Sequence, residues 1–132
     1  VVNLHYLGHM IEKHVQGRTS PRITLSREDE LLDTGGGVRK ALSFFGEDPF
    51  YVLNADVIWT DGPQKSTLSR MADAWDGDKM DLLLLLHPSK DVPAYAGKGD
   101  YQLDDGADRP VFKKGGNYIF AGPRIVHPRL FD

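Results

Sequence analysis

The chain has 132 residues, no cysteine and a formal net charge of -3. Its length allows one compact core, and the lack of cysteine excludes disulfides and thiolate metal sites. The slightly acidic balance argues against a nucleic-acid partner. The longest apolar run, residues 82–86, is far shorter than the roughly 20 residues of a membrane helix, and no signal-peptide pattern opens the sequence. We therefore expect a folded cytoplasmic protein with no membrane partner.

Strand and helix patterns alternate through the first two thirds of the chain. Short apolar or β-branched runs predict strands at residues 1–3, 23–25, 50–53 and 80–86. Apolar residues at helical spacing predict helices at residues 4–15, 38–45 and 68–75. The run at 50–53 is continuous, which is typical of a strand covered on both faces, and the strand at 80–86 is also expected to be buried. The alternation predicts an α/β fold of the Rossmann-like, three-layer type with a mostly parallel sheet.

The last third of the chain has a different pattern. Short strands are predicted at residues 101–103, 110–113 and 118–120, separated by turns at 104–106 and 115–116. We interpret them as a small antiparallel insert. Residues 126–131 resemble the start of a further helix with Pro128 in its first turn.

Three successive glycines, Gly35 to Gly37, occupy the predicted approach to the helix at 38–45. Because glycine has no Cβ, a flat base or a phosphate can come close to the main chain there, where backbone N–H groups are free to donate. No Lys-Ser or Lys-Thr follows the last glycine, so this is not a Walker loop. A sharp turn without any ligand is an equally good interpretation of the glycines alone.

Asp56 follows the predicted strand at residues 50–53. In open α/β sheets, ligands bind at the carboxyl ends of the strands, and a carboxylate there suits magnesium shared with substrate phosphates. Capping of the following turn, through Asn54 or Thr60, is the alternative role for this aspartate.

Taken together, the two segments resemble those of the sugar-1-phosphate nucleotidyltransferases. They are DTGGGV at residues 33–38 and FYVLNADV at residues 50–57. The resemblance is closest to the bacterial N-acetylmuramate-1-phosphate uridylyltransferase group and its guanylyltransferase-labelled relatives. It extends to VVNLHYL at 1–7, to residues 81–86, to YIFAG at 118–122 and to HPRLF at 127–131. It implies the nucleotide-diphospho-sugar transferase type of α/β fold.

The resemblance implies a reaction in which a phosphate oxygen of a sugar 1-phosphate attacks the α-phosphorus of a nucleoside triphosphate and pyrophosphate leaves. Catalysis would consist of positioning and charge neutralisation, with Mg²⁺ as cofactor. Asp56 would be the catalytic and metal-binding residue, and Asn54 would orient it or touch the ribose. The remaining implied contacts are Thr34, Gly35, Gly36 and Gly37 for the base, Gly122 for the sugar phosphate, and Asp100 and Tyr101 as sugar-side candidates for selectivity.

The sequence also departs from the family pattern. The Gly-rich loop with its arginine, and the phosphate-contacting lysine, do not precede Val1, and the second magnesium aspartate would lie beyond Asp132. We therefore expect residues 1–132 to be one nucleotidyltransferase domain truncated at both ends. Lys113 and Lys114 stand where many relatives have Glu-Lys-Pro, and solvated turn lysines are the favoured interpretation. Pro123 replaces an aliphatic residue.

Several functions remain open from the sequence. The narrower resemblance implies UTP with N-acetylmuramate 1-phosphate, and GTP with mannose 1-phosphate is the alternative pair. A nucleotide-sugar-dependent glycosyltransferase usually has an Asp-x-Asp pair, whose first acid is missing from Asn54-Ala55-Asp56. A non-catalytic nucleotide-binding domain is the third class. The oligomeric state is left open.

Overall fold

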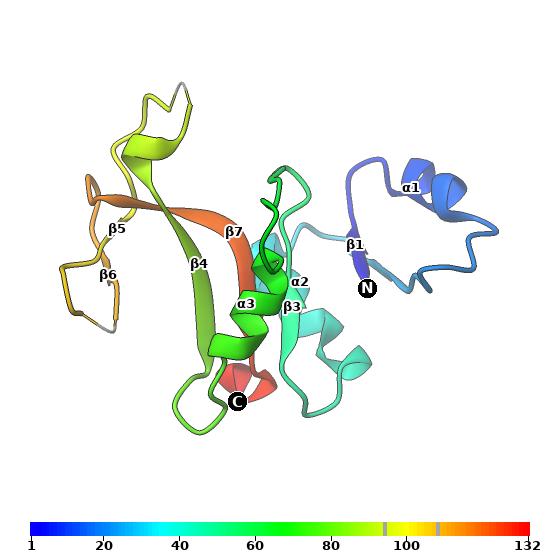
Figure 1. Ribbon diagram of the computed structural model, residues 1–132. Helices are drawn as coiled ribbons and strands as arrows, with labels where there is room; N and C mark the ends of the chain where they lie inside the picture. Colours follow the sequence, from blue (N-terminus) through cyan, green and yellow to red (C-terminus); the bar gives the residue numbers. More distant parts are fainter. Residues whose placement is uncertain (94, 108) are drawn as a thin grey trace. The chain divides into compact units, whose positions relative to one another are not determined.

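The computed structural model describes residues 1–93, 95–107 and 109–132 (Figure 1). The chain divides into two compact units. The N-terminal unit comprises Val1–Asp48 with Phe131–Asp132, and the C-terminal unit comprises Pro49–Leu130. Among the helices of the described residues, none has the length and apolar character that crossing a bilayer requires. The prediction of a single nucleotidyltransferase domain stays a prediction.

The N-terminal unit contains a parallel strand pair joined by a helical crossover. Its elements are β1 (Val2–Leu4), α1 (Gly8–Val15), β2 (Leu25–Arg27), α2 (Asp33–Ala41) and the 3-10 helix η1 (Leu42–Phe44). In the β1–β2 pair, Val2 lies opposite Leu25 and Leu4 opposite Arg27. The prediction that the first helix includes Leu4 was wrong, because Leu4 is the last residue of β1 and is only 2% exposed.

The C-terminal unit contains an antiparallel sheet around one long strand. Its strands are β3 (Phe50–Val52), β4 (Leu82–Pro88), β5 (Tyr101–Gln102), β6 (Val111–Phe112) and β7 (Tyr118–Val126). Its helical segments are α3 (Thr67–Ala74), η2 (Ser89–Asp91) and η3 (Pro128–Phe131). Val126 is paired with both Phe50 of β3 and Leu82 of β4, so β7 lies between these two strands (Figure 1).

This position of β7 overturns the predicted mostly parallel sheet. β3 and β4 are each antiparallel to β7 and therefore run parallel to one another, but they do not pair directly. The only parallel pairing among the described residues is the small β1–β2 sheet. The small antiparallel insert was predicted correctly in type, since β5 pairs antiparallel with β6 and with β7.

β7 is also longer than predicted and contains a bulge. The predicted strand ended at Phe120, whereas β7 continues through Gly122-Pro123, a sequence that is uncommon inside a strand. The pairs Leu84 with Arg124 and Leu86 with Phe120 show that β7 advances four residues while β4 advances two. The extra residues include Gly122, whose φ is 97°, and the fully buried Pro123. A bulge re-aims side chains within a strand, so this irregularity is a candidate position for function.

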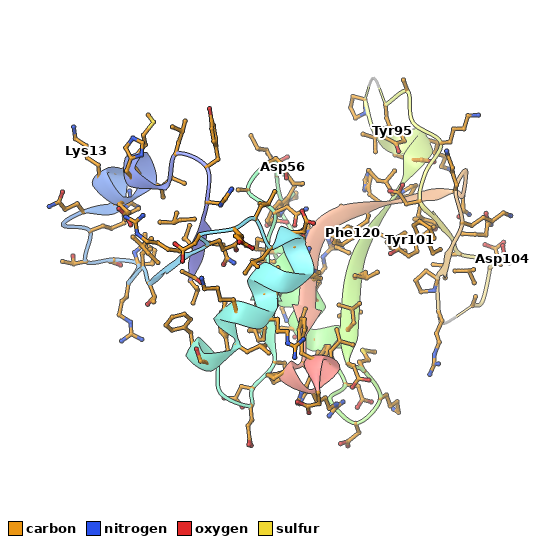
Figure 2. All side chains as sticks on the ribbon, turned by 180° about the vertical axis from the view of Figure 1, so that it is seen from behind. Lys13, Asp56, Tyr95, Tyr101, Asp104 and Phe120 are labelled. Carbon is orange, nitrogen blue, oxygen red and sulfur yellow. The ribbon has the colours of Figure 1, made fainter. Side chains whose placement is uncertain are left out.

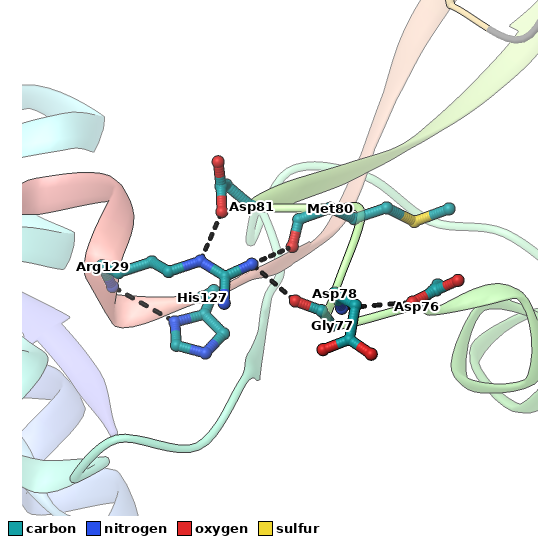
Figure 3. Close-up of polar contacts among 7 residues, drawn as sticks. All are labelled: Asp76, Gly77, Asp78, Met80, Asp81, His127 and Arg129. Carbon is teal, nitrogen blue, oxygen red and sulfur yellow. Dashed lines mark hydrogen bonds and ion pairs between the residues drawn. The ribbon is translucent and has the colours of Figure 1, made fainter.

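Arg129 ties the segment before β4 to the end of β7 (Figure 3). Its Nε donates to Asp81 Oδ1 at 2.5 Å, and its Nη2 donates to the carbonyl oxygens of Gly77 at 2.6 Å and Met80 at 3.0 Å. The backbone N–H of His127 donates to the carbonyl of Asp81. Arg129 belongs to η3, a 3-10 helix where the sequence predicts the start of a further helix.

We expect the substitution Arg129→Met to lower the free energy of unfolding by about 1–2 kcal/mol, because two carbonyl oxygens lose a charged donor at a half-exposed site. Urea denaturation measures this change. Arg39→Met, at an exposed arginine without a side-chain hydrogen bond in the described structure, is the matched control and should leave stability nearly unchanged. Equal losses in the two variants would contradict the role of the Arg129 contacts.

Candidate functional site

In the C-terminal unit, the structure brings together two of the predicted site residues, Asn54 and Gly122. Asn54 follows β3, and Gly122 lies in the bulge of β7. A Cβ atom built on Gly122 would be 3.0 Å from Val57 Cγ2 and 3.6 Å from Asn54 Cβ. With its positive φ, this position therefore requires glycine for two reasons, backbone conformation and close packing of the loop that follows β3.

Arg124 connects these two residues. Its Nη1 donates both to Asn54 Oδ1 and to the carbonyl oxygen of Gly122, each at 3.0 Å. The guanidinium carbon lies 5.5 Å from the centroid of the Phe120 ring. Arg124 is only 8% exposed, and its Nη2 is buried without a hydrogen-bond partner in the described part of the chain. Burial lowers the pKa of Arg124 from its ordinary value, although a guanidinium remains charged at neutral pH.

Sequence reasoning missed Arg124. It is one of sixteen lysines and arginines that look scattered along the chain. A usable signal was its place two residues after Gly122, since alternate residues of a strand lie on the same face. A second signal was that Arg124 is the one charged residue in the segment from Tyr118 to Val126.

Asp56 lies in the loop after β3 with its side chain exposed (Figure 2). Its carboxylate makes no hydrogen bond or ion pair with any described residue, so the alternative role of capping the following turn has no support in the structure. No group of three or more histidine or acidic residues in the described ranges could hold a metal ion. The predicted role of Asp56 as a metal ligand stays a prediction.

Asp61, five residues further on, has the structural role that Asp56 lacks. Its Oδ1 accepts hydrogen bonds from the backbone N–H of Thr67 at 2.9 Å and from the Thr67 hydroxyl at 2.6 Å. These bonds lower the pKa of the Asp61 carboxyl. Asp61 thus stabilises the start of α3. The two aspartates differ in that Asp61 has hydrogen-bond partners and Asp56 has none among the described residues.

The sugar-side candidates Asp100 and Tyr101 have structural contacts with β7 and β6. Asp100 Oδ2 accepts a hydrogen bond from the backbone N–H of Phe120 at 3.4 Å. Tyr101 is paired with Tyr118, and its ring packs edge to face on Phe112 at a centroid distance of 5.6 Å. Figure 2 shows Tyr101 well apart from the loop that carries Asp56. Their predicted contacts with a sugar phosphate stay predictions.

Lys113 and Lys114 are exposed, and neither side chain makes a hydrogen bond within the described ranges. They lie after β6, where the chain turns towards Gly115. These positions agree with the interpretation of both lysines as solvated residues.

In the N-terminal unit, the glycines are not a turn before a helix, and that prediction was wrong. α2 begins at Asp33, so Thr34, Gly35, Gly36 and Gly37 form its first turns. The left-handed residue is Asp33 itself, with φ 54°. The backbone N–H of Leu32, just before α2, donates to Glu28 Oε2 at 3.2 Å. The left-handed backbone conformation is thus at Asp33, and the three glycines after it have helical backbone conformation.

The three glycines have different surroundings. A Cβ on Gly36 would lie 2.9 Å from Leu32 Cβ, and a Cβ on Gly37 would lie 2.7 Å from both Asn3 Nδ2 and Glu28 Oε1. A Cβ on Gly35 would meet no atom within 4 Å. Close packing therefore explains why residue 37 is glycine, and it also favours glycine at position 36. Of the three glycines, only Gly35 leaves an open backbone surface that a flat base could cover.

Glu28 anchors this part of the N-terminal unit. It is 9% exposed, and its Oε1 accepts a hydrogen bond from Asn3 Nδ2 at 2.8 Å. This bond is the main cause of the lowered pKa of the Glu28 carboxyl. Glu28 lies in a charged stretch of the sequence, and no local pattern predicts this bond because its partner Asn3 is 25 residues away.

Comparison with known proteins shows that the chain is similar to sugar-1-phosphate nucleotidyltransferases over nearly all of its length, which confirms the resemblance inferred from the sequence. No family model matches the chain. It is 34% identical, over 98% of its residues, to N-acetylmuramate alpha-1-phosphate uridylyltransferase from Caulobacter vibrioides. It is 28% identical, over its whole length, to the protein of the same name from Neisseria meningitidis, and 31% identical to mannose-1-phosphate guanyltransferase from Hypocrea jecorina.

The chain spans about half the length of the two uridylyltransferases, 56% of each, and 37% of the guanyltransferase. Among solved structures, UDP-glucose pyrophosphorylase from Acinetobacter baumannii superposes with a TM-score of 0.63 at 19% identity, covering 92% of this chain and 47% of that one. The UTP-bound form of the enzyme from the same organism gives a TM-score of 0.62, covering 92% of this chain and 52% of that one. These structures show that the chain shares the fold of the matched part of UDP-glucose pyrophosphorylase.

Two glycine substitutions separate the packing role from the open surface. We expect Gly37→Ala to lower the free energy of unfolding by about 1–3 kcal/mol, because the new methyl group displaces the hydrogen-bonded Asn3 and Glu28 side chains. We expect Gly35→Ala to raise it by about 0.5–1 kcal/mol, because alanine is favoured over glycine within a helix and meets no neighbour. Urea denaturation of both variants measures the difference. Equal effects would contradict the distinct surroundings of the two glycines.

Glu28 should make stability depend on pH. Its pKa is lowered in the folded state, so its contribution is full above the unfolded glutamate pKa of about 4.3. That contribution is lost as pH falls through the lower folded-state pKa. Denaturation across this range should show the natural protein and Glu28→Gln converging in stability as pH falls. Glu30→Gln, at an exposed glutamate, is the control, and a pH-independent difference for Glu28→Gln would contradict the assignment.

Proposed function

We propose that the protein of which this chain is part transfers a nucleotidyl group from a nucleoside triphosphate to a sugar 1-phosphate. A phosphate oxygen of the sugar 1-phosphate forms a bond to the α-phosphorus, and the bond to the leaving pyrophosphate breaks. The products are a nucleotide sugar and pyrophosphate. The reaction requires neither a protein nucleophile nor a redox step, so positioned donors and cations are sufficient to catalyse it.

The observation that carries this proposal is the 34% identity to the Caulobacter vibrioides uridylyltransferase over 98% of the chain. Two of the matched relatives have the same name, so UTP and N-acetylmuramate 1-phosphate are the proposed substrates. GTP with mannose 1-phosphate is the second pair, because a guanyltransferase matches the same span at 31% identity. A cytoplasmic location follows from this proposal, since nucleoside triphosphates are made and used there.

Mg²⁺ is the proposed cofactor, with Asp56 as its protein ligand. An exposed carboxylate without a protein partner fits a hard cation that keeps water and phosphate oxygens in its coordination shell. When bound, the ion would neutralise charge that develops on the phosphates. Asn54, two residues before Asp56, is held by Arg124 and so fixes the loop from which Asp56 extends.

The proposed base platform is the open backbone at Gly35, with Thr34 beside it on the first turn of α2. Thr34 is exposed, and the absence of neighbours around Gly35 allows a planar group to lie on the main chain. Gly36 and Gly37 shape this turn through their packing inside the N-terminal unit. On the sugar side, Gly122 is the proposed direct contact, and Asp100 and Tyr101 support the strand that carries it.

Two other functions would use the same fold. A glycosyltransferase would consume a nucleotide sugar instead of forming one, and the single acid in Asn54-Ala55-Asp56 gives it less support. A non-catalytic domain would bind nucleotide without turnover. Release of pyrophosphate from a nucleoside triphosphate separates the proposed reaction from both.

We expect the full-length natural protein to release pyrophosphate from UTP only when N-acetylmuramate 1-phosphate and Mg²⁺ are present, with less release from GTP and mannose 1-phosphate. Asp56→Asn should lower kcat/KM by about 10²-fold or more and raise the Mg²⁺ concentration needed for half-maximal rate, because a metal ligand loses its charge. A coupled pyrophosphate assay measures both quantities.

Asp105→Asn is the matched control, since Asp105 is an exposed aspartate in a turn of the same unit. It should leave the rate and the Mg²⁺ dependence unchanged. An absence of turnover with every nucleoside triphosphate and sugar phosphate would overturn the proposed reaction. An unchanged Mg²⁺ dependence in Asp56→Asn would overturn the metal assignment alone.

A further inference from the structure

Arg124 is a buried cation whose charge is not balanced by any carboxylate in the described ranges. The ion pairs found there involve other residues, namely Arg27 with Glu12, Lys65 with Asp73, Lys79 with Asp76, and Arg129 with Asp81. Only 8% of Arg124 is exposed, and its Nη2 has no partner. Burying a charged group without a counterion costs free energy. An anionic ligand close to Arg124 would offset this cost.

The guanidinium of Arg124 determines how Asn54 can meet a ligand. A guanidinium has donors and no acceptor, so the Asn54 atom that faces Nη1 at 3.0 Å is the carbonyl oxygen Oδ1. The two N–H groups of Asn54 Nδ2 are then left over, and no residue in the described parts of the chain accepts from them. Asn54 is half-buried and remains partly accessible. It therefore presents donors, and not an acceptor, to whatever binds beside it.

The same guanidinium nitrogen fixes the bulge of β7. Nη1 carries two N–H groups, and its two acceptors are Asn54 Oδ1 and the carbonyl oxygen of Gly122. Phe120, on the other side of the bulge, covers the guanidinium with its ring. Arg124 thus sets the positions of a side-chain amide in the loop after β3 and of a backbone peptide in β7.

A sugar 1-phosphate matches this arrangement. Its phosphate is a dianion with several acceptor oxygens, and hydrogen bonds between ionised groups and amide donors are among the stronger ones in proteins. The free N–H groups of Asn54 and the positive charge of Arg124 have the polarity that such a ligand requires. Gly122 is buried against Val57 and Asn54, so it contributes by fixing the position of Asn54.

We propose that Arg124 is a positioning residue for the sugar 1-phosphate, which holds Asn54 with its amide donors free for substrate oxygens and supplies uncompensated positive charge beside them. This inference rests on the proposed function and deepens it by assigning the acceptor subsite. Arg124 acts through Asn54 and through the electrostatic field, so it is not a catalytic residue.

The test compares Arg124→Met, Arg124→Lys and Arg129→Met in the full-length natural protein. We expect Arg124→Met to raise the KM for N-acetylmuramate 1-phosphate by about tenfold or more, because a charged hydrogen bond and a nearby charge are lost. The KM for UTP should stay within about twofold. Arg124→Lys, which keeps the charge, should recover part of the loss. Arg129→Met removes an arginine that only stabilises the same unit, so it should leave both KM values unchanged.

A merely structural role would give a different pattern. If Arg124→Met lowers the melting temperature but leaves the KM for the sugar phosphate unchanged, or if Arg129→Met raises that KM equally, the proposal is wrong. If Arg124→Met does not fold, the same comparison is made with Arg124→Lys. If Arg124→Lys leaves the ratio of the sugar-phosphate KM to the UTP KM unchanged, the proposal is wrong.

A double-mutant cycle tests the route through Asn54. When Arg124 acts by holding Asn54, the combination of Asn54→Ala with Arg124→Met should raise the sugar-phosphate KM by less than the product of the two single effects. Independent, multiplicative effects would overturn the route through Asn54.

Failure of the proposed function is detected separately. If the unsubstituted protein shows no turnover, calorimetric titration with N-acetylmuramate 1-phosphate replaces the kinetic comparison. Binding that weakens in Arg124→Met and not in Arg129→Met would support the subsite without the reaction. No binding by the unsubstituted protein would overturn the subsite as well.

Discussion

The antiparallel insertion of β7 between β3 and β4 is the constraint on which the candidate site in the C-terminal unit depends. Paired with both neighbours at Val126, β7 is held along its second half by hydrogen bonds on either edge. Its bulge therefore forms at a fixed place, with Gly122 against Asn54 and Val57. A backbone irregularity held by regular pairing is a precise means of placing a ligand contact.

The buried charge of Arg124 is stabilised at this bulge by two carbonyl-type oxygens and an aromatic face instead of by a carboxylate. A carboxylate partner would neutralise the guanidinium, whereas neutral acceptors leave its field available to an anion. The exposed Asp56 belongs to the same loop as Asn54, and in the proposed function it would supply charge of the opposite sign for a metal ion. In the proposed function, the loop after β3 would thus combine a donor for phosphate oxygens with a ligand for a cation.

Local features could be predicted from the sequence, and features that depend on distant partners could not. Strands form at β3 and β4, where short apolar runs predicted them, and α3 forms because Leu68, Met71 and Ala72 follow helical spacing. The mostly parallel sheet was wrong because nothing in the sequence of β3 or β4 shows that β7 will lie between them. Arg124 was missed because its acceptor Asn54 lies 70 residues earlier, and the glycines were placed outside α2 because the left-handed turn is made by Asp33.

The central claim is that the sugar phosphate binds at Asn54, beside the bulge of β7 that Arg124 holds. A crystal structure of the full-length natural protein with UDP-N-acetylmuramate and Mg²⁺ tests it most directly. We expect a phosphate oxygen to accept a hydrogen bond from Asn54 Nδ2 and the ion to be bound by Asp56. A product bound elsewhere, or one that accepts no hydrogen bond from Asn54 while Arg124 keeps its two acceptors, would contradict the claim.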